Sequence, residues 1–369
     1  MPTPADRVTL LIGGQAHADW ESFDVDSDLL TPADAWHVTL GQAPGDLPAA
    51  VAPGAACEIR IGADTVMRGA VDEVDISVDK SSHRLSLSGR DGAGVLVDCS
   101  APVFVHRMAT LQEIIKAVVV PLGIAAKRIR ISADHPRTRE KINVEPGASA
   151  WDVLAQSAEA NGLWPWFAPD GTLVVGGPDY TTAPVATLVL RRSGAGNNVL
   201  SLEHRVSIAG RYSKVTVLGQ THGTELETGK HAIRGAWQDP AVPGNRPKIV
   251  IDHECDNTAL ANDRARKLLA DSRLQGVTLT ARVKGCRITA PGEPGDGLLW
   301  TPGQRVRVIS EPHGIDAVYF LMARNFSGSR GAGATAQLTL KEDGVWTLDA
   351  HPHKNKHRRG SNAIMQDAP

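Results

Sequence analysis

The chain has few aromatic residues and almost no net charge. Aromatic side chains make up 4% of its 369 residues, and the formal net charge is −2. Phosphate binding needs clustered excess lysine and arginine, so the sequence does not predict nucleic acid as a specific ligand. It also lacks a signal-type start and any apolar stretch near the roughly 20 residues that cross a bilayer. We therefore expect a soluble protein, made in the cytoplasm, that does not insert into a membrane by itself.

Cysteines are also scarce. Cys57, Cys99, Cys255 and Cys286 lie far apart without CxxC spacing, so neither a zinc knuckle nor a thioredoxin motif is encoded. The simplest interpretation is that all four cysteines are reduced thiols. Cys99 stands between the apolar residues 95–97 and 101–102, and we predict that it is buried and unreactive, because a packed thiol behaves as a small hydrophobe.

The common catalytic signatures are missing. There is no Gly-x-Ser-x-Gly elbow and no His-Glu-x-x-His motif. The glycine-rich residues 89–94 follow a strand, but they lack the Lys-Ser/Thr of a phosphate loop, and no helix of adequate length is expected there. Gly229-Lys230 has no upstream glycine at the required spacing. We predict no catalytic, cofactor-binding or metal-binding residue, and no enzymatic activity.

Three groups of titratable residues remain as candidates. They are the strand acids Asp72, Glu73 and Asp75, the triplet Asp252, His253 and Glu254, and the histidines His351, His353 and His357. The strand acids could form a catalytic carboxylate pair. The triplet could form an acid–base or metal site, and the three histidines could bind a metal ion. The ordinary interpretations are favoured: acids on the solvent side of a strand, acids near a helix N-terminus, and a solvated basic tail.

The composition favours a mainly β fold. With 42% hydrophobic residues, 36 glycines and 23 prolines, the chain is globular and rich in turns. Its length predicts two to four domains. Residues 1–98 contain six apolar runs typical of strands, separated by Asp, Gly and Pro turns, which predicts a small antiparallel barrel or sandwich. The runs are 8–12, 20–25, 36–40, 57–61, 65–78 and 84–88.

Residues 99–180 change pattern and predict a small mixed α/β domain. Thr110 and Glu113 form a capping box ahead of a helical apolar stripe. A second helix begins at Ser149, and a hairpin follows over 163–175. The residues Glu145-Pro146-Gly147 with Trp151, Trp164 and Trp166 are also compatible with a glycan-binding platform, although tryptophans in a helix–hairpin core are the more ordinary use.

Residues 181–348 return to strands. We expect them at 186–190, 199–208, 214–218, 248–251, 277–283, 305–308, 318–323 and 337–340, with one helix over 257–272. The sequence predicts a second β domain with this helix inserted. The stretch 221–247 reads as an exposed loop, and residues 349–369 read as a flexible basic tail that contacts a neighbour on assembly.

One stretch resembles a known family. Gly89-Arg90-Asp91, a short glycine-containing turn and then Leu96-Val97-Asp98-Cys99-Ser100-Ala101-Pro102 are similar to the baseplate hub protein of Mu-like contractile phage tails. Further residues fall in that family's order: Gly13-Gly14, Trp20, Gly147, Gly194, 197–200, 211–213, 217–220 and 299–303. The more distant relatives are the T-even phage hub and the hub domain of type VI secretion spikes.

This resemblance implies a fold and a function. It implies two similar antiparallel β-barrel domains flanking the mixed domain. It also implies a homotrimeric ring in the virion baseplate that adapts the six-fold tail tube to the three-fold central spike. The partners would be the tail tube protein, the central spike protein and other baseplate proteins. The alternative is a tail-associated peptidoglycan hydrolase or a glycan-binding module, which would need a catalytic constellation that the sequence does not display.

Overall fold

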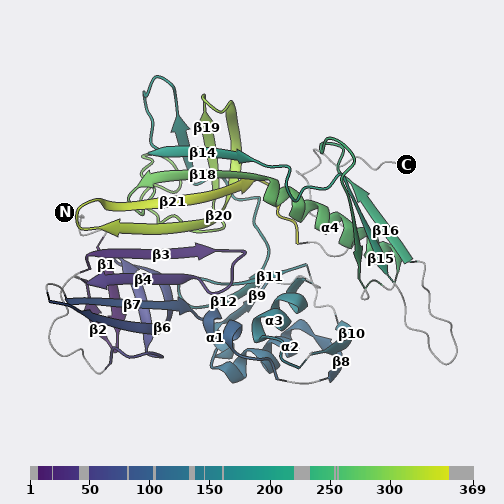
Figure 1. Cartoon of the computed structure of the whole chain (residues 1–369), viewed down its shortest axis with the longest axis horizontal. Helices are drawn as coiled ribbons and strands as arrows, with labels where there is room; N and C mark the ends of the chain where they lie inside the picture. Colours follow the sequence, from purple (N-terminus) through teal and green to yellow (C-terminus); the bar gives the residue numbers. More distant parts are fainter. Residues whose placement is uncertain are drawn as a thin grey trace.

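The computed structural model describes residues 7–18, 20–40, 50–80, 83–102, 105–132, 138–144, 146–159, 162–219, 233–252, 255 and 257–348. These residues form one 13-stranded sheet and three smaller sheets. The fold is mainly β, as the sequence predicts, and Figure 1 shows the large sheet beside a cluster of short helices. None of the helices in these ranges is long and apolar enough to span a membrane.

The N-terminal β half comprises strands β1 to β7. They are β1 (Val8–Ile12), β2 (Gln15–His17), β3 (Ser22–Asp28), β4 (Ala35–Leu40), β5 (Ala56–Ile61), β6 (Asp64–Val78) and β7 (His83–Asp91). Their order in the sheet is β3-β4-β7-β6-β5-β1-β2, with every neighbour antiparallel. Alternate residues of β5, such as Cys57 and Ile59, are buried because successive strand side chains face opposite sides.

The middle part contains the short helices. It comprises α1 (Ala93–Asp98), β8 (Val105–Thr110), α2 (Leu111–Val118), the 3-10 turns η2 (Val120–Leu122) and η3 (Ala126–Arg128), β9 (Ile129–Ile131), β10 (Thr138–Asn143), α3 (Ala150–Glu159), β11 (Trp164–Phe167) and β12 (Leu173–Gly176). The predicted capping box at the start of α2 is confirmed, since Thr110 and Glu113 bond each other's backbone N–H groups. The predicted hairpin is confirmed as β11 and β12.

The C-terminal β half comprises six strands. They are β13 (Ala186–Leu190), β14 (Ser201–Val206), β18 (Val277–Lys284), β19 (Arg305–Ser310), β20 (Ile315–Ser329) and β21 (Gly333–Glu342). Their order is β14-β18-β21-β20-β19-β13. The strands predicted at 318–323 and 337–340 belong to β20 and β21. Both are longer than predicted, because β20 pairs with β19, β21 and β3, and β21 pairs with β18 and β20.

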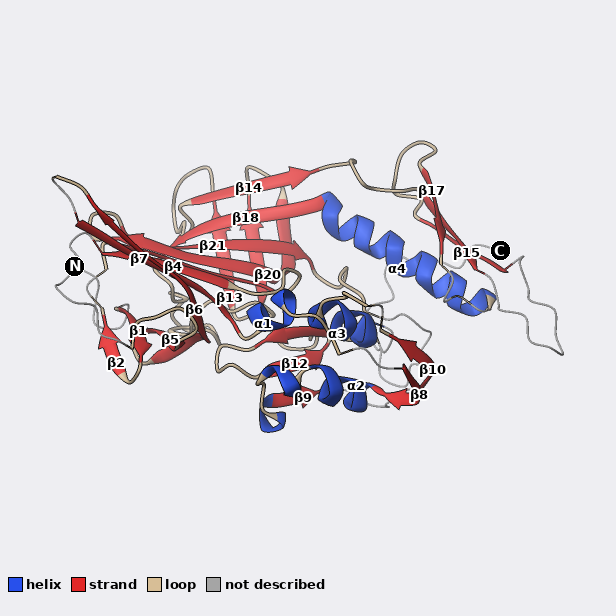
Figure 2. Ribbon diagram, turned by 60° about the horizontal axis from the view of Figure 1, so that its bottom comes forward, coloured by secondary structure: helices blue, strands red, loops and turns tan. Residues whose placement is uncertain are grey.

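A separate unit interrupts this half. It comprises β15 (Lys214–Gly219), β16 (Ile233–Gln238), β17 (Pro247–Ile251) and α4 (Thr258–Gly276). Figure 2 shows α4 running from this three-stranded sheet to the start of β18. β16 lies in the stretch that was expected to be an exposed loop, so that expectation is wrong over 233–238. Gly235 permits it, because a side chain there would overlap the backbone of α4 at Ala261.

The two β halves share one continuous sheet through β3 and β20. These strands pair antiparallel from Ala323 opposite Asp28 to Ser329 opposite Ser22. Phe326 and Val25 face each other at this junction with no exposed side-chain surface, inside one hydrophobic core that draws on both halves. The junction joins residues far apart in the chain, such as Val25 and Arg324, which are 299 positions apart.

The two β halves also repeat one strand order. Position by position, β3-β4-β7-β6-β5-β1 in the first half corresponds to β14-β18-β21-β20-β19-β13 in the second, and each set has the same order along the chain. The outermost strand differs, since β1 runs antiparallel to β5 whereas β13 runs parallel to β19. The predicted closed barrels are not found: among the described residues the strands form open sheets, and no ladder returns from β1 or β2 to β3.

Candidate functional site

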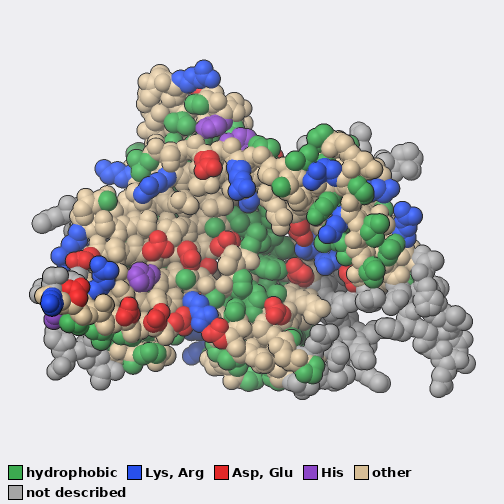
Figure 3. Space-filling model, viewed as in Figure 1, with side chains coloured by type: hydrophobic (Ala, Val, Ile, Leu, Met, Phe, Trp, Pro, Cys, Tyr) green, Lys and Arg blue, Asp and Glu red, His purple; other side chains and the backbone are tan. Residues whose placement is uncertain are grey.

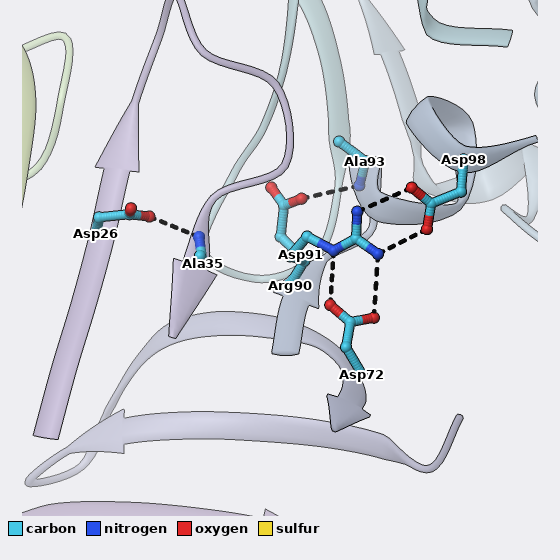
Figure 4. A network of polar contacts seen from close by, with 7 residues as sticks. All are labelled: Asp26, Ala35, Asp72, Arg90, Asp91, Ala93 and Asp98. Carbon is cyan, nitrogen blue, oxygen red and sulfur yellow. Dashed lines mark hydrogen bonds and ion pairs between the residues drawn. The ribbon is translucent and has the colours of Figure 1, made fainter. Parts of the chain in front are cut away.

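Arg90 ties the N-terminal β half to the middle part. It lies near the end of β7, and its guanidinium bonds Asp72 of β6 (Nε to Oδ2, 2.6 Å) and Asp98 at the end of α1 (Nη2 to Oδ2, 2.6 Å). Figure 4 shows both carboxylates held by the one guanidinium. The hydrogen bonds from Arg90 hold the pKa of Asp98 below its ordinary value. The arrangement fixes α1 against the sheet.

Gly89 and Asp91, on either side of Arg90, also shape the connection between β7 and α1. Gly89 faces β4 and β6 so closely that an added Cβ would overlap the Ala70 carbonyl oxygen and lie 2.7 Å from the Trp36 ring. Asp91 accepts a hydrogen bond from the Ala93 N–H at 2.8 Å and so satisfies one open donor at the start of α1. α1 itself was not expected here, and it has only 6 residues.

A small cavity lies where the three parts of the chain meet. Its volume is about 170 Å³. The N-terminal β half contributes Asp34 and Asp91, the middle part contributes Trp166 and Phe167, and the C-terminal β half contributes Arg324. In Figure 3 hydrophobic side chains gather near the centre of the face shown, in the region where these parts adjoin.

Burial dominates the electrostatics of this cavity. It raises the pKa of Asp34 to about 7 and that of Asp91 well above its ordinary range, with the charge of Asp34 adding to the effect on Asp91. Arg324 is fully buried, and burial lowers its pKa to about 10. Its Nη1 donates to the Val25 carbonyl oxygen at 2.8 Å, while its Nε has no hydrogen-bond partner within the described residues.

The side chains of this cluster connect separate strands and loops. Arg324 extends from β20 across the junction to the β3 backbone, and Asp34 accepts from the Asp28 N–H at 2.8 Å. Asp26 accepts from the Ala35 N–H, which fixes the start of β4 as Figure 4 shows. Each contact joins one strand or loop to another. No group of three or more metal-ligating residues occurs in the part of the chain that the structure describes.

The structure separates the titratable candidates. Asp72 is held by Arg90, whereas Glu73 and Asp75 are exposed further along β6. Asp252 pairs with Arg264 of α4 at 3.2 Å. His253 and Glu254 lie outside the described residues, as do Gly229-Lys230 and the tail histidines His351, His353 and His357.

The three tryptophans of the proposed glycan platform do not form one exposed face. Trp151 is buried in the core of the middle part. Trp164 donates from Nε1 to the Leu29 carbonyl oxygen at 2.5 Å, and both Trp164 and Trp166 pack against the cluster around Phe320. Glu145 lies outside the described residues. These side chains therefore join the middle part to the two β halves.

Cys99 is not buried as expected. It has intermediate exposure, while Cys57, Cys255 and Cys286 are buried. The cause is the short helix α1. With Leu96 facing the core, Val95 faces solvent, and Cys99 lies at the C-terminal end of the helix. Reasoning from the sequence also missed Asp34 and Arg324, because nothing in their local patterns indicates that one cavity holds both.

Four family models match consecutive parts of the chain. Residues 7–91 match the N-terminal domain of Mu phage baseplate assembly protein GpP-like proteins, and residues 93–177 match the second domain of baseplate hub protein gp44-like proteins. Residues 211–269 match the third domain of tail protein NMB1110-like proteins, and residues 271–345 match an NMB1110-like tail protein C-terminal domain.

Individual relatives agree. The chain is 22% identical over 331 residues to baseplate hub protein gp44 of Escherichia phage Mu, covering 87% of this chain and 83% of that protein. A tail protein structure from Neisseria meningitidis MC58 is 41% identical with a TM-score of 0.82, covering 94% of this chain and 99% of that one. The 43 kDa tail protein of prophage MuSo2 from Shewanella oneidensis is 26% identical with a TM-score of 0.79, covering 94% and 100%.

A type VI secretion component, the E. coli c3393 protein, shares the fold with a TM-score of 0.60 at 12% identity, covering 93% of this chain and 79% of that one. The junction at Gly89-Arg90-Asp91, which carries the resemblance seen in the sequence, thus lies where the first two family models meet. The chain belongs to the Mu-like phage baseplate hub and tail protein family.

Proposed function

We propose that this protein is the structural hub of a contractile tail baseplate and that three copies form a closed ring. Each copy would contribute two β halves, so that three chains offer six similar surfaces to a six-fold tail tube and keep three-fold symmetry toward the central spike. The role is architectural and non-enzymatic. The virion baseplate would be its final location, after assembly in the bacterial cytoplasm.

The repeated strand order of the two β halves carries this proposal. A trimer can meet a hexameric tube without mismatch only if each chain presents two nearly equivalent surfaces. The β3–β20 junction supports it further, because it holds the two halves side by side in one sheet. The division into residues 1–98, 99–180 and 181–348 belongs to the same proposal, with the middle part set between two ring-forming units.

The solution mass of the full chain tests the ring. Light scattering at micromolar concentration should give the mass of a trimer, and averaged electron micrographs should show a ring with six similar lobes. A monomer throughout that range would contradict the ring. Removal of residues 349–369 should leave the trimer intact and weaken binding to a purified tube or spike protein; unchanged binding would remove the role proposed for that tail.

A cell-wall hydrolase is the alternative that an assay must address. No observation favours it, because the buried acids near the cavity are engaged with backbone and Arg324. Purified trimer should release no soluble fragments from peptidoglycan above the level of a heat-inactivated sample. Release that depends on Asp34 or Asp91 would replace the architectural proposal with an enzymatic one.

A further inference from the structure

The two β halves correspond residue by residue, not only strand by strand. Both long strands carry a register shift against their neighbour, between Val71 and Glu73 in β6 and between Leu321 and Ala323 in β20. Aligning the two irregularities sets Val71 on Leu321. A β-bulge fixes the register of its strand, so the alignment can be continued from these positions to the C-terminal ends of β6 and β20.

The neighbouring ladders extend the alignment across the sheet. Leu87 of β7 corresponds to Leu338 of β21, since they lie opposite Val74 and Arg324 respectively. Through β4 and β18, Val38 then corresponds to Ala281. Each of these four residues in β7, β21, β4 and β18 is almost completely buried. The final step sets Phe23 of β3 on Leu202 of β14.

Each β half therefore has one edge segment without a second partner within the described residues, and the corresponding strand of the other half shows which strand would pair there. In the second half the end of β20 is covered by β3 of the same chain. In the first half the corresponding residues 73–78 of β6 pair only with β7 among the described residues. β14, which corresponds to β3, likewise has β18 as its only partner strand in the described ranges.

The exposed side chains on β6 and β14 indicate that each of these edges lacks a partner strand in the part of the chain that the structure describes. Phe326 has no exposed surface beneath the β3–β20 junction, whereas its counterpart Ile76 is 53% exposed. Val78 on β6 is 63% exposed, and Val206 on β14 is 66% exposed. Exposed apolar residues on unpaired edge strands mark a place where another strand adds.

We propose that residues 74–78 of β6 pair antiparallel with β14 of a second copy of this chain, in the register that β20 and β3 show within one copy. This sets Val74 opposite Val206, Asp75 opposite Arg205 and Val78 opposite Leu202. The inference rests on the proposed ring and names the strands that join its copies. Three contacts of this kind between chains would alternate with three β3–β20 junctions within chains.

The chemistry of the two edges is complementary in this register. Val74 meets a valine and Val78 meets a leucine on the face that corresponds to the buried face of β20. On the other face the acidic Asp75 lies opposite the basic Arg205, and opposite charges directly across an antiparallel pair are stabilising. The contact is head to tail, so it forms a ring where its rotation closes.

Disulfide cross-linking tests both the partner and the register. Directly opposed residues of antiparallel strands have Cα atoms roughly 4.5–5.5 Å apart, within reach of a disulfide. The double variant Val74→Cys/Val206→Cys should therefore form covalent trimers and dimers under mild oxidation, visible on a non-reducing gel. The matched control Val74→Cys/Leu202→Cys is out of register by about 13 Å at roughly 3.3 Å per residue and should form almost none, as should each single variant.

Charge reversal supplies an independent test. Asp75→Arg and Arg205→Asp should each lower the trimer fraction measured by light scattering several-fold, and the double variant should restore it. All these positions are at exposed or half-exposed edges, and circular dichroism checks that each variant keeps the fold.

The outcomes separate this inference from the ring itself. A trimer that cross-links only in the Val74–Val206 pair, with rescue by the charge swap, supports the pairing. A trimer that fails to cross-link there, or cross-links equally in the control pair, overturns the pairing and leaves the ring standing. A monomer overturns both.

Discussion

Replacing Gly89 by alanine should destabilise the protein far more than one methyl group suggests. The added Cβ would overlap the Ala70 carbonyl oxygen of β6 and approach the Trp36 ring of β4 to 2.7 Å. The first of these neighbours is backbone, which a rotamer change cannot move. Strands β6 and β7 would have to separate beyond the spacing of about 4.7–4.9 Å at which ladder hydrogen bonds form.

The expected loss follows from those contacts. Forced shifts in a packed region cost about 1–3 kcal/mol, and each ladder hydrogen bond that is lost adds about 1 kcal/mol. The free energy of unfolding should therefore fall by about 3 kcal/mol or more. For a cooperative unit of 150–250 residues this lowers the melting temperature by about 6–12 °C.

Thermal and urea unfolding, followed by circular dichroism, measure the effect. The matched control is Gly331→Ala, because Gly331 has no atom within 4 Å of an added Cβ and no positive φ. The control should stay within about 0.5 kcal/mol of the original protein. If Gly89→Ala unfolds together with the control, the close approach of β6 and β7 is not what requires glycine in this motif.

Further substitutions test the junction and its surroundings. Arg90→Met should cost about 1–2 kcal/mol of unfolding free energy, since it removes two partly exposed ion pairs, whereas Arg307→Met at an exposed pair should cost under about 1 kcal/mol; equal losses in urea titrations would contradict the clamp. Because the folded pKa of Asp34 is raised to about 7, its contribution to stability is complete below about pH 4 and is lost as the pH rises toward 7. Asp34→Asn should flatten that decline by up to about 1.4 kcal/mol per pH unit, and an unchanged slope in unfolding measured from pH 4 to 8 would refute it. Cys99 should react first with a thiol reagent, because the other cysteines are buried; mass spectrometry showing an earlier adduct elsewhere would contradict its exposure.

The local patterns of the sequence were sufficient for most elements. The apolar runs 57–61 and 65–78 predicted β5 and β6, and β5 places every second side chain inward as a half-buried strand does. Thr110 and Glu113 predicted the start of α2, since a capping box depends only on residues three apart. The helix that follows the glycine-rich residues 89–94 has only 6 residues, too few to show a periodic apolar stripe.

The long-range contacts were beyond those patterns. Asp72 was identified as one of several strand acids, but the sequence does not show that Arg90 selects it and leaves Asp75 exposed. The pairing of β3 with β20 has no local signal, because two strands with alternating patterns can pair with many others. Open sheets were mistaken for barrels for the same reason: closure depends on which edges meet, and strand propensities do not encode that.

The β3–β20 junction has a consequence for synthesis of the chain. Val25 and Arg324, which are joined across it, lie 299 positions apart. At a synthesis rate of roughly 5–20 residues per second, β3 waits about 15–60 s before β20 emerges. During that time one edge of the new N-terminal sheet is open to pairing with other chains. Asp24, Asp26 and Asp28 occupy every second place on β3, and charges at an open edge oppose such pairing. We therefore expect the acidic residues of β3 to disfavour pairing with other chains until β20 has been synthesised.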